Sequence, residues 1–474
     1  MADQGVAFQS RIDKALNNEA VQENFRSAMS MLMEKRSAQF SDDEALQQKR
    51  QRAQSIRAHA LRNLPQLLEQ LEQKLIENGI QVHWAVDGDE ANQIIHSLLS
   101  NAGAQKVVKG KSMVSEEIDL NHYLEQRGFE VLESDLGEFI IQLAHETPSH
   151  IVMPAIHKTK KEIAELFQQH FPELPYSEDV DEMTQQARQI LRDRFAQADA
   201  GISGVNFMVA ETGTLCLVEN EGNGRMTTTV PPLHIAVTGI EKVVEKLEDV
   251  PPLLDLLTKS ATGQPITTYF NMITHPRQWG EKDGPEAVHL VLIDNGRSRI
   301  RRDEELLDTL RCIRCGSCIN HCPVYVQLGG HAYGTVYPGP IGTALEPMRL
   351  GLDQIGVLTS ACSLCGACGQ VCPVQIPLPK LINRLRAESV AHQQQNSAVK
   401  GGGSLRKRAE VWSWRGWRWL YSSGFRIRLF RWATTRLRRL TPSQMGGWSR
   451  YRTVLKPAPC SLAALMAARG VKDE

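Results

Sequence analysis

The first part of the chain has the hydrophobic spacing of helices. Residues 1–79 are polar and helix-prone, and leucines recur at three- and four-residue intervals before Gly79. The leucines of this stripe are Leu61, Leu64, Leu67, Leu68, Leu71 and Leu75. Because such a stripe covers one face of a helix, the pattern predicts a helical lead-in over residues 1–79.

From Ile80 onward, short runs of branched hydrophobic residues alternate with helical periods. Strands are expected at 81–86, 106–110, 129–133, 150–154, 205–210, 214–219, 235–238 and 288–292. Helices are expected to begin near Asp89 and to cover 116–127 and 158–197. Such alternation is typical of a mostly parallel sheet covered by helices. The pattern therefore predicts one α/β domain over residues 80–300, a common size for a single domain of this class.

Two copies of one cysteine spacing follow this domain. Each copy reads C-x2-C-x2-C-x3-C-P, which is the ligand spacing of [4Fe–4S] clusters in two-cluster ferredoxins. In those proteins the fourth cysteine of each copy binds the other cluster. The sequence therefore predicts two [4Fe–4S] clusters with crossed ligands. The first is expected on Cys312, Cys315, Cys318 and Cys372, and the second on Cys362, Cys365, Cys368 and Cys322.

Zinc and disulfides are the alternatives for these cysteines. Structural zinc usually appears as paired C-x2-C knuckles, whereas each copy here has a third close cysteine and a proline after the fourth. The chain opens at Met1 without a basic-then-apolar leader, which favours a reducing cytosol, where disulfides are rare. No run approaches the roughly 18 apolar residues of a membrane-spanning helix. A cytoplasmic iron–sulfur protein is therefore expected.

The cysteine region and the residues after it divide into three parts. A helical dicluster domain is expected over residues 301–391, with a helical pattern at 344–355 between the two motifs. Residues 392–404 are rich in Gln and Gly and are expected to form a flexible linker. Residues 405–474 then form a C-terminal extension.

The C-terminal extension is basic and rich in tryptophan. Residues 401–474 contain sixteen Lys or Arg and three Asp or Glu, although the formal net charge of the whole chain is zero. Six of the eight tryptophans lie between Trp412 and Trp448. A helix over 411–431 would carry one aromatic face, formed by Trp412, Trp419, Leu420, Ile427 and Phe430. Such a face suits docking to a partner protein first, a membrane surface second and single-stranded nucleic acid last.

Turn-forming residues in the α/β domain predict a small-molecule site. The candidate residues are Glu211, Thr212, Gly213, Thr214, Asn223 and Arg225. Backbone N–H groups in such turns can bind an anionic or carbonyl ligand, although ordinary connecting turns have the same composition. Neither a P-loop nor a complete G-x-G-x-x-G is present, and the segment Lys109-Gly110-Lys111-Ser112 lacks the first glycine of a phosphate loop.

The sequence assigns no catalytic residue. His234, and His145 next to Glu146, are of the type that transfers protons near neutral pH, but isolated histidines are more often structural. Cys216 alternates with apolar residues and is expected to be a small buried side chain. Cys460 lies outside any ligand spacing and is given no role.

Together these features resemble the lactate utilisation protein B family of bacterial iron–sulfur proteins. The resemblance rests on the 211–225 region with Pro231 and His234, on the eight motif cysteines and on the Trp/Arg-rich tail, and it covers essentially the whole chain. It implies an α/β domain of the isomerase/CoA-transferase-like type, a ferredoxin-like dicluster domain and a C-terminal extension. It also implies a cytoplasmic complex with lactate utilisation proteins A and C that oxidises L-lactate to pyruvate.

Two classes of function fit this reading. The first is an electron-transfer subunit of that complex, with the basic tail reaching a partner or a peripheral membrane site with a quinone-linked acceptor. The second is a free-standing α/β enzyme acting on a sugar phosphate or a CoA ester, with clusters that are structural. Another hydroxy acid, such as glycolate, also fits the first class, because a fold alone does not assign a substrate.

Overall fold

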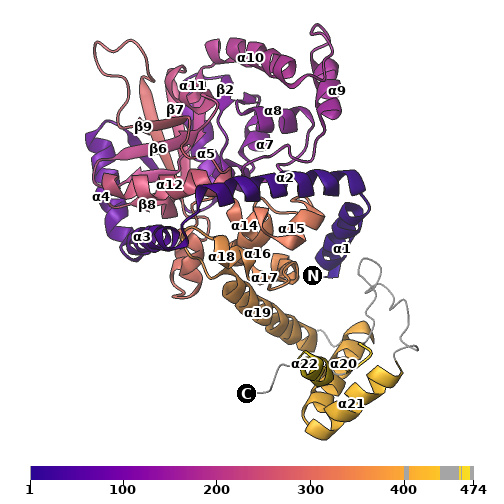
Figure 1. Ribbon diagram of the computed structural model, residues 1–474. Coiled ribbons are helices and arrows are strands. Elements are labelled where there is room, and N and C mark those ends of the chain that lie inside the picture. Colours follow the sequence, from indigo (N-terminus) through magenta and orange to yellow (C-terminus); the bar gives the residue numbers. More distant parts are fainter. Residues whose placement is uncertain (1, 400–404, 438–457, 461, 470–474) are drawn as a thin grey trace. The chain divides into compact units, whose positions relative to one another are not determined.

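A computed structural model describes residues 2–399, 405–437, 458–460 and 462–469 (Figure 1). The chain divides into two compact units, Met1–Val390 and Ala391–Glu474, which are described separately. The first unit contains the α/β domain and both cysteine motifs. It therefore holds every residue that was expected to bind a cluster or a small molecule.

The N-terminal residues are helical, as predicted. The helices are α1 (Ala2–Leu16), α2 (Glu19–Gln39), α3 (Asp43–Arg62) and α4 (Leu64–Glu77). Asn18 and Asp42 cap α2 and α3 by accepting backbone N–H groups, and a proline stands at the start of α4. All six leucines of the predicted stripe are buried. Helix α4 contacts β1 (Gln81–Ala85) and β8 (Val243–Val244), whereas α2 and α3 contact the region of residues 301–391 that carries the cysteine motifs.

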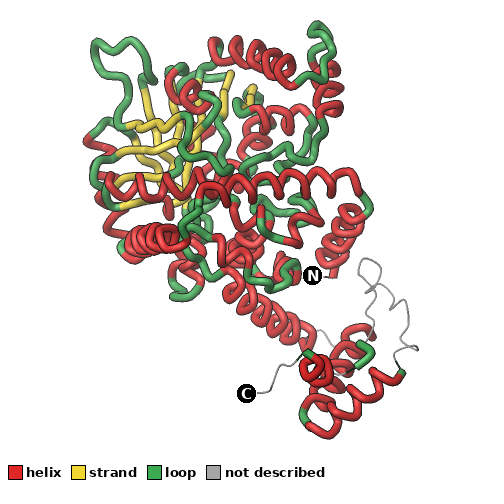
Figure 2. Tube along the Cα trace, in the orientation of Figure 1, coloured by secondary structure: helices red, strands yellow, loops and turns green. Residues whose placement is uncertain are grey.

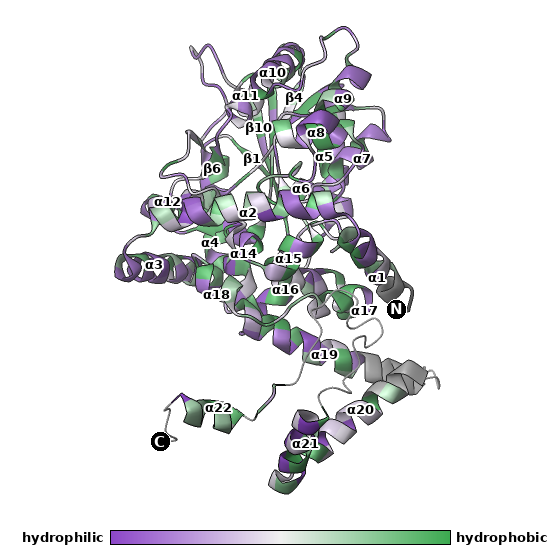
Figure 3. Cartoon of the chain, turned by 45° about the vertical axis from the view of Figure 1, so that its right-hand side comes forward, coloured by the Kyte–Doolittle hydropathy of each residue, from purple (hydrophilic) through white to green (hydrophobic). Residues whose placement is uncertain are grey.

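A six-stranded sheet forms the centre of the α/β domain. Its order is β1 (Gln81–Ala85), β10 (Ala287–Ile293), β7 (Leu233–Gly239), β4 (Ala200–Gly204), β2 (Lys106–Lys109) and β3 (Glu130–Glu133). Every neighbouring pair is parallel, which confirms the expected mostly parallel sheet. Strands β4 and β7 are buried along their whole length, as is usual for a parallel sheet covered on both faces. Figure 3 shows these hydrophobic central strands and the largely hydrophilic helix α10 (Val180–Ala196) outside them.

A second sheet of four strands was not predicted. Its order is β8 (Val243–Val244), β5 (Phe207–Val209), β6 (Thr214–Glu219) and β9 (Tyr269–Ile273). Strand β6 pairs antiparallel with both β5 and β9, so the expected strands at 205–210 and 214–219 belong to this sheet and not to the parallel one. Figure 2 shows both sets of strands gathered in one part of the first unit, with helices elsewhere.

Helices and connections complete the α/β domain. Helix α5 (Gly88–Asn101) begins near Asp89 as expected, and the 158–197 region holds α9 (Lys160–His170) and α10. The remaining helices of this part are α8 (Leu136–Leu143), α11 (Asn223–Thr229) and α12 (Val250–Ala261). The helix expected over 116–127 is instead two short helices, α6 (Met113–Glu117) and α7 (Leu120–Glu125), because Asp119 between them has a left-handed φ of 51°.

The strand expected at 150–154 is absent, since the structure has a turn there. The buried imidazole of His150 accepts hydrogen bonds at Nδ1 from the backbone N–H groups of Val152 (3.0 Å) and Met153 (3.1 Å). Branched residues in this segment suggested a strand, but their N–H groups bond to a side chain instead of a neighbouring strand.

The cysteine region is helical, as predicted. Its elements are α13 (Arg297–Arg301), η3 (Leu306–Arg311), α14 (Ser317–Asn320), α15 (Pro323–Leu328), α16 (Gly339–Leu350), α17 (Leu352–Ile355), η4 (Gly356–Ser360), α18 (Ala367–Val371) and α19 (Leu378–Val399). Helix α19 runs through residues 392–399, so the expected linker is wrong over those residues. Residues 400–404 lie outside the described part. The expected domain boundaries inside the first unit stay predictions.

The described residues of the C-terminal extension form three helices. These are α20 (Leu405–Tyr421), α21 (Gly424–Arg436) and α22 (Leu462–Ala468). The prediction of a single helix over 411–431 is wrong. The helix is interrupted just before Gly424, and the following helix α21 packs on α20. Trp417 stacks on Tyr421 with ring centroids 4.6 Å apart and meets Phe430 edge-on at 6.3 Å. Trp448 lies outside the described residues.

Several aromatic side chains of this extension face solvent. Trp412 and Phe425 are each 70% exposed, and Trp419 is 63% exposed. Within the described ranges, no helix is both long and apolar enough to cross a membrane.

Candidate metal centre and adjoining cavity

The two cysteine motifs fold into loops with the same backbone conformation. The second residue after the first cysteine is left-handed in both, with φ of 62° at Arg314 and 57° at Leu364. The residue after the second cysteine is a left-handed glycine in both, Gly316 at 73° and Gly366 at 88°. Left-handed backbone is uncommon for Arg and Leu, so its recurrence at matching positions indicates a common constraint on both loops.

This conformation turns backbone N–H groups toward the thiols. Arg314 N donates to Cys312 Sγ at 3.4 Å, and Leu364 N donates to Cys362 Sγ at 3.3 Å. A third donor, Ile376 N, lies 3.4 Å from Cys372 Sγ. Successive N–H groups in such turns form anion-binding concavities of the kind found at iron–sulfur sites, and they stabilise thiolates.

Three cysteines of the first motif share a small cavity with the last cysteine of the second. The cavity is lined by Cys312, Cys315, Cys318 and Cys372, together with apolar side chains that include Ile151 and Ile341. The last three of these cysteines are buried and Cys312 is half-buried. The residues present therefore fit a buried cluster with four thiolates from two motifs.

The other four cysteines are also neighbours. Burial raises the pKa of the Cys322 thiol, and the nearby Cys362 and Cys365 raise it further. Burial raises the pKa of Cys368 to about 12, and Cys322 contributes to that shift as well. Cys322 thus lies among the cysteines of the second motif, and within this set Cys365 is exposed.

Over the described ranges, no three His, Cys, Asp or Glu side chains come close enough to hold a single metal ion. The two cysteine sets meet where α14, which carries Cys318, packs against α18, which carries Cys368.

Cationic side chains hold the cysteine loops through backbone carbonyls. Arg50 on α3 donates to Cys372 O at 2.9 Å and to Gly369 O at 3.2 Å. Arg386 on α19 donates to Cys362 O at 2.8 Å. These positive charges lie at the cysteine loops, where they would offset the negative charge of a bound cluster.

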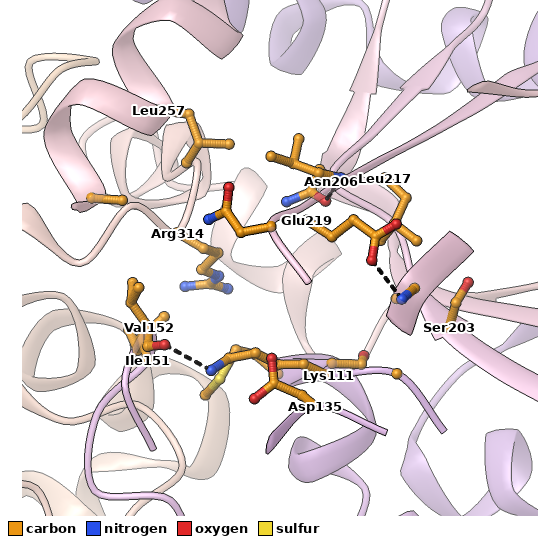
Figure 4. Close-up of a pocket in the computed structure, with 18 of the residues that line it drawn as sticks. Lys111, Asp135, Ile151, Val152, Ser203, Asn206, Leu217, Glu219, Leu257 and Arg314 are labelled. Atoms are coloured by element: carbon orange, nitrogen blue, oxygen red, sulfur yellow. Dashed lines mark hydrogen bonds between the residues drawn. The ribbon is translucent and has the colours of Figure 1, made fainter. Parts of the chain in front are cut away.

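A larger cavity of about 350 Å³ lies beside the first cysteine set. The loops after β2 and β4 contribute to it, so it lies at the carboxyl ends of strands of the parallel sheet, where open α/β sheets bind ligands. The loop after β6 of the second sheet also contributes. Figure 4 shows part of its lining, with Arg314 facing the space bordered by Lys111 and Glu219. Its other polar residues include Ser203, Asn206 and Lys242.

The six residues expected to bind a small molecule are not brought together. Asn223 lines the large cavity, whereas Arg225 is exposed and does not. The N–H groups of Gly224 and Arg225 donate to the Glu219 carboxylate at 2.6 and 2.7 Å, so that carboxylate occupies the loop's donors. Glu211, Thr212, Gly213 and Thr214 lie at the opposite end of β6, where Asn78 Nδ2 donates to Thr212 O at 2.9 Å.

The other residues considered from sequence have structural partners. Lys109 is buried and its Nζ lies 2.6 Å from Glu133 Oε1, so it is not free to bind phosphate. Glu146 pairs with His157 at 2.7 Å, and not with its neighbour His145. Burial raises the pKa of Cys216 to about 12, as expected for an apolar packing residue. Lys242 and Ser203 were missed, because no local pattern marks them.

His234 is buried against the large cavity. Its Nε2 lies 2.8 Å from the Ser203 hydroxyl, and Ser203 lines the cavity. Burial, followed by the charge of His289, lowers the pKa of His234 to about 4. The imidazole is therefore neutral near neutral pH, and it positions Ser203.

This burial predicts a pH dependence of stability. The pKa of His234 is about 4 in the folded chain and about 6.5 in an unfolded one. Its contribution is therefore fully present above pH 6.5 and is lost as the pH falls toward 4. The stability lost through His234 between about pH 7 and about pH 5 is about 2 kcal/mol. Melting temperatures measured across this range should fall less in His234→Gln than in the wild type, and equal falls would contradict the assignment.

Comparison with known proteins now places the chain. Residues 68–293 match the LUD domain, residues 308–376 the 4Fe-4S dicluster domain, and residues 384–471 the C-terminal part of lactate utilisation protein B. Lactate utilization protein B of Bacillus velezensis is 42% identical over 419 residues, which cover 86% of this chain and 88% of that protein. The chain belongs to the lactate utilization protein B family.

Two further relatives match most of the chain. Lactate utilization protein B of Bacillus subtilis is 41% identical over 86% of this chain and 87% of that protein. An Escherichia coli protein named uncharacterized electron transport protein YkgF is 47% identical over 71% of this chain and 70% of that protein. A solved DUF162 family protein from Deinococcus radiodurans covers 48% of this chain and 98% of that one at 16% identity, with a TM-score of 0.28 that is too low to support an argument.

Proposed function

We propose that the chain is an iron–sulfur electron-transfer subunit of a complex that oxidises L-lactate to pyruvate. Within the lactate utilization protein B family, its partners would be lactate utilisation proteins A and C. The observation that carries the proposal is the repeated loop conformation of the two cysteine motifs, with Cys372 in the cavity of the first motif. A pair of such loops in one chain is the arrangement of proteins that pass single electrons.

The proposed ligand sets are the crossed ones. Cys312, Cys315, Cys318 and Cys372 would hold one [4Fe–4S] cluster, and Cys362, Cys365, Cys368 and Cys322 the other. Bound clusters supply reversible one-electron chemistry. The chain's own residues bury the first set from water, direct backbone N–H groups at Cys312 and Cys362, and place positive charge near both sets.

Two one-electron sites match the stoichiometry of the proposed reaction. Oxidation of L-lactate to pyruvate releases two electrons and two protons, and two clusters in one chain can hold both electrons. The exposed Cys365 marks the side of the second set that faces solvent, which suits transfer to another protein. The α/β domain is inferred to be of the isomerase/CoA-transferase-like type.

The direct test combines the purified chain with its A and C partners under anaerobic conditions. L-lactate should bleach the visible absorption of the clusters, whereas the chain without partners should not respond. Bleaching by glycolate and not by L-lactate would show that glycolate is the substrate of the complex. If the isolated chain turned over a sugar phosphate or a CoA ester and lactate bleached nothing, the electron-transfer proposal would be wrong.

The C-terminal extension is proposed to dock to a partner protein. Its exposed tryptophans alternate with arginines, and Arg426 lies 4.3 Å above the Trp419 ring. Trp and Arg are enriched at the centres of protein interfaces. The same surface would suit the inner face of a membrane with a quinone-linked acceptor, which is the second choice, and we place the protein in the cytoplasm.

Deleting residues 405–474 tests the docking role. These residues form part of a unit separate from the cysteine-bearing one. The deletion should therefore leave iron content unchanged and abolish co-purification with lactate utilisation proteins A and C. A shortened chain that loses only its membrane fraction would support lipid binding instead, and one that keeps both associations would contradict a docking role.

A further inference from the structure

Arg314 connects the large cavity with the first cysteine set. Its backbone N–H donates to Cys312 Sγ, and its side chain lines both the large cavity and the small one that holds the cysteines (Figure 4). Ile151 lines both cavities as well. A molecule in the large cavity would therefore touch residues that also line the cavity of the first cysteine set.

The Arg314 guanidinium has hydrogen-bond donors without acceptors. Its Nε and Nη1 atoms are buried and have no hydrogen-bond partner. Its ion pair with Glu241 is long, at 3.6 Å, and Glu241 is held more closely by Arg297 at 2.5 Å. The Tyr337 ring lies 4.1 Å from the guanidinium, and Cys312 and Glu117 are also close enough to act on its charge. Buried cationic donors are costly when unpaired, so their position at a cavity indicates an anionic acceptor from outside the chain.

Lys242 brings a second positive charge to the same cavity. It is buried, and its only described hydrogen bond is a long one of 3.5 Å to Cys312 O. Lys111, the third cation in the lining, is already held by Glu138 at 2.9 Å and by Val152 O at 3.1 Å. Arg314 and Lys242 are thus the two cations of this cavity that have donors to spare.

The carboxylates in the lining do not fill this need. Asp135 caps α8 by accepting from Gly137 N at 3.0 Å, Glu219 accepts from Gly224 N at 2.6 Å, and Glu221 accepts from Leu136 N at 3.3 Å. All three are held by backbone N–H groups. The lining also includes apolar side chains, among them Leu217, Val237 and Leu257. The cavity therefore combines apolar side chains with two cations that have donors to spare, which suits a ligand with an organic body and a negatively charged end.

We propose that this cavity binds an organic anion whose carboxylate or phosphate group is held by Arg314 and Lys242 beside the first cysteine set. Its volume of about 350 Å³ falls within the usual range for small-molecule sites, about 300 to 1,000 Å³. Ser203 and Asn206 add neutral hydrogen-bonding groups for the rest of the ligand. Anion binding itself does not depend on the proposed function. The effect of the bound anion on the first cluster does rest on that function.

The test measures anion binding calorimetrically in the anaerobically purified full chain. The probes are L-lactate, pyruvate, glycerol 3-phosphate and inorganic phosphate, and lactamide is the neutral counterpart of lactate. At least one organic anion should bind and lactamide should not. Arg314→Gln and Lys242→Gln should each weaken that binding by about 10- to 100-fold, as expected for loss of one charged hydrogen-bonding partner. A carboxylate and a phosphate ester that differ in affinity would identify the preferred group.

Arg50→Gln is the matched control. Arg50 also places a positive charge near Cys372 but does not line the large cavity, so its loss should leave anion affinity unchanged. Equal weakening in Arg50→Gln and Arg314→Gln, binding of lactamide as tight as that of lactate, or no binding of any anion would each overturn the proposal. Iron analysis of every variant checks that the clusters are retained.

A second readout separates this inference from the proposed function. A bound anion adds negative charge beside the first cysteine set, so it should lower the midpoint potential of one cluster in the wild type and not in Arg314→Gln. Anion binding without lactate-driven bleaching would leave the cavity assignment standing and remove the lactate complex. Lactate-driven bleaching in a chain that binds no anion would leave the lactate complex standing and remove the cavity assignment.

Discussion

Replacing Cys312 and Cys322 together by serine should remove both clusters, although the two residues belong to one motif. In the crossed arrangement Cys312 serves the first set and Cys322 the second. Replacing Cys312 and Cys372 should instead remove only one cluster, although these residues come from different motifs. The reason is that Cys372 lines the same cavity as Cys312, whereas Cys322 lies beside Cys362 and Cys365.

Iron and acid-labile sulfide analysis measures both outcomes. The wild type should contain about eight iron atoms per chain, the Cys312/Cys372 variant about four, and the Cys312/Cys322 variant close to none. Cys216→Ser is the control, because Cys216 is buried in β6 and lies in neither set. The opposite order of the two double variants would show that each motif holds its own cluster and would refute the crossed arrangement.

Replacing Arg57 by methionine should cause a large loss of stability. Arg57 on α3 is fully buried and donates to the backbone carbonyls of Val243 at 2.8 Å, Leu310 at 3.1 Å and Arg311 at 3.4 Å, and also to that of Glu241. It therefore joins α3, the second sheet and the segment that leads directly into Cys312. Methionine fills similar space but leaves these carbonyls without their donors, which should cost about 3 kcal/mol or more.

Thermal unfolding of the cluster-loaded protein tests this prediction. Arg52→Met is the matched control, because Arg52 lies on the same helix and is exposed. The melting temperature should fall clearly in Arg57→Met and stay within error in Arg52→Met. Similar melting temperatures for the two variants would show that the buried guanidinium contributes little.

Elements with strong local patterns could be predicted from sequence. The leucine stripe before Gly79 and the branched runs of β2, β7 and β10 mark their elements by themselves, because burial on one or both faces sets their spacing. Strand β4 was missed since it contains two glycines, which have low β propensity. Gly201 is required there because a side chain would collide with the Thr227 carbonyl, a contact that only the folded chain reveals.

The second sheet depends on distant partners, whereas the turn at 150–154 is held by a side chain of the segment itself. Strand β9 is only partly buried and is defined by its pairing with β6, about fifty residues earlier in the sequence. The 150–154 segment has the composition of a strand, but the His150 imidazole takes its N–H groups. Long-range pairing therefore defines β9, whereas at 150–154 a local side-chain hydrogen bond replaces strand pairing.

The candidate site also has one part that a local pattern marks and one part that only the fold brings together. The cluster cysteines could be identified from sequence because their spacing is set within ten residues by the geometry of one loop. The large cavity could not, because Lys242, Ser203 and Arg314 come from three separate segments and only the fold brings them to one space. The glycine-rich loop at Asn223 was a reasonable candidate, but Glu219 of the same chain takes its donors.

The presence of two linked clusters can be measured by EPR spectroscopy of the anaerobically purified chain after dithionite reduction, combined with iron and sulfide analysis of the same sample. Two [4Fe–4S] clusters predict signals from two reduced centres that interact magnetically, with about eight iron and eight sulfide per chain. A colourless protein with zinc, no labile sulfide and no EPR signal would show that the chain holds no iron–sulfur cluster.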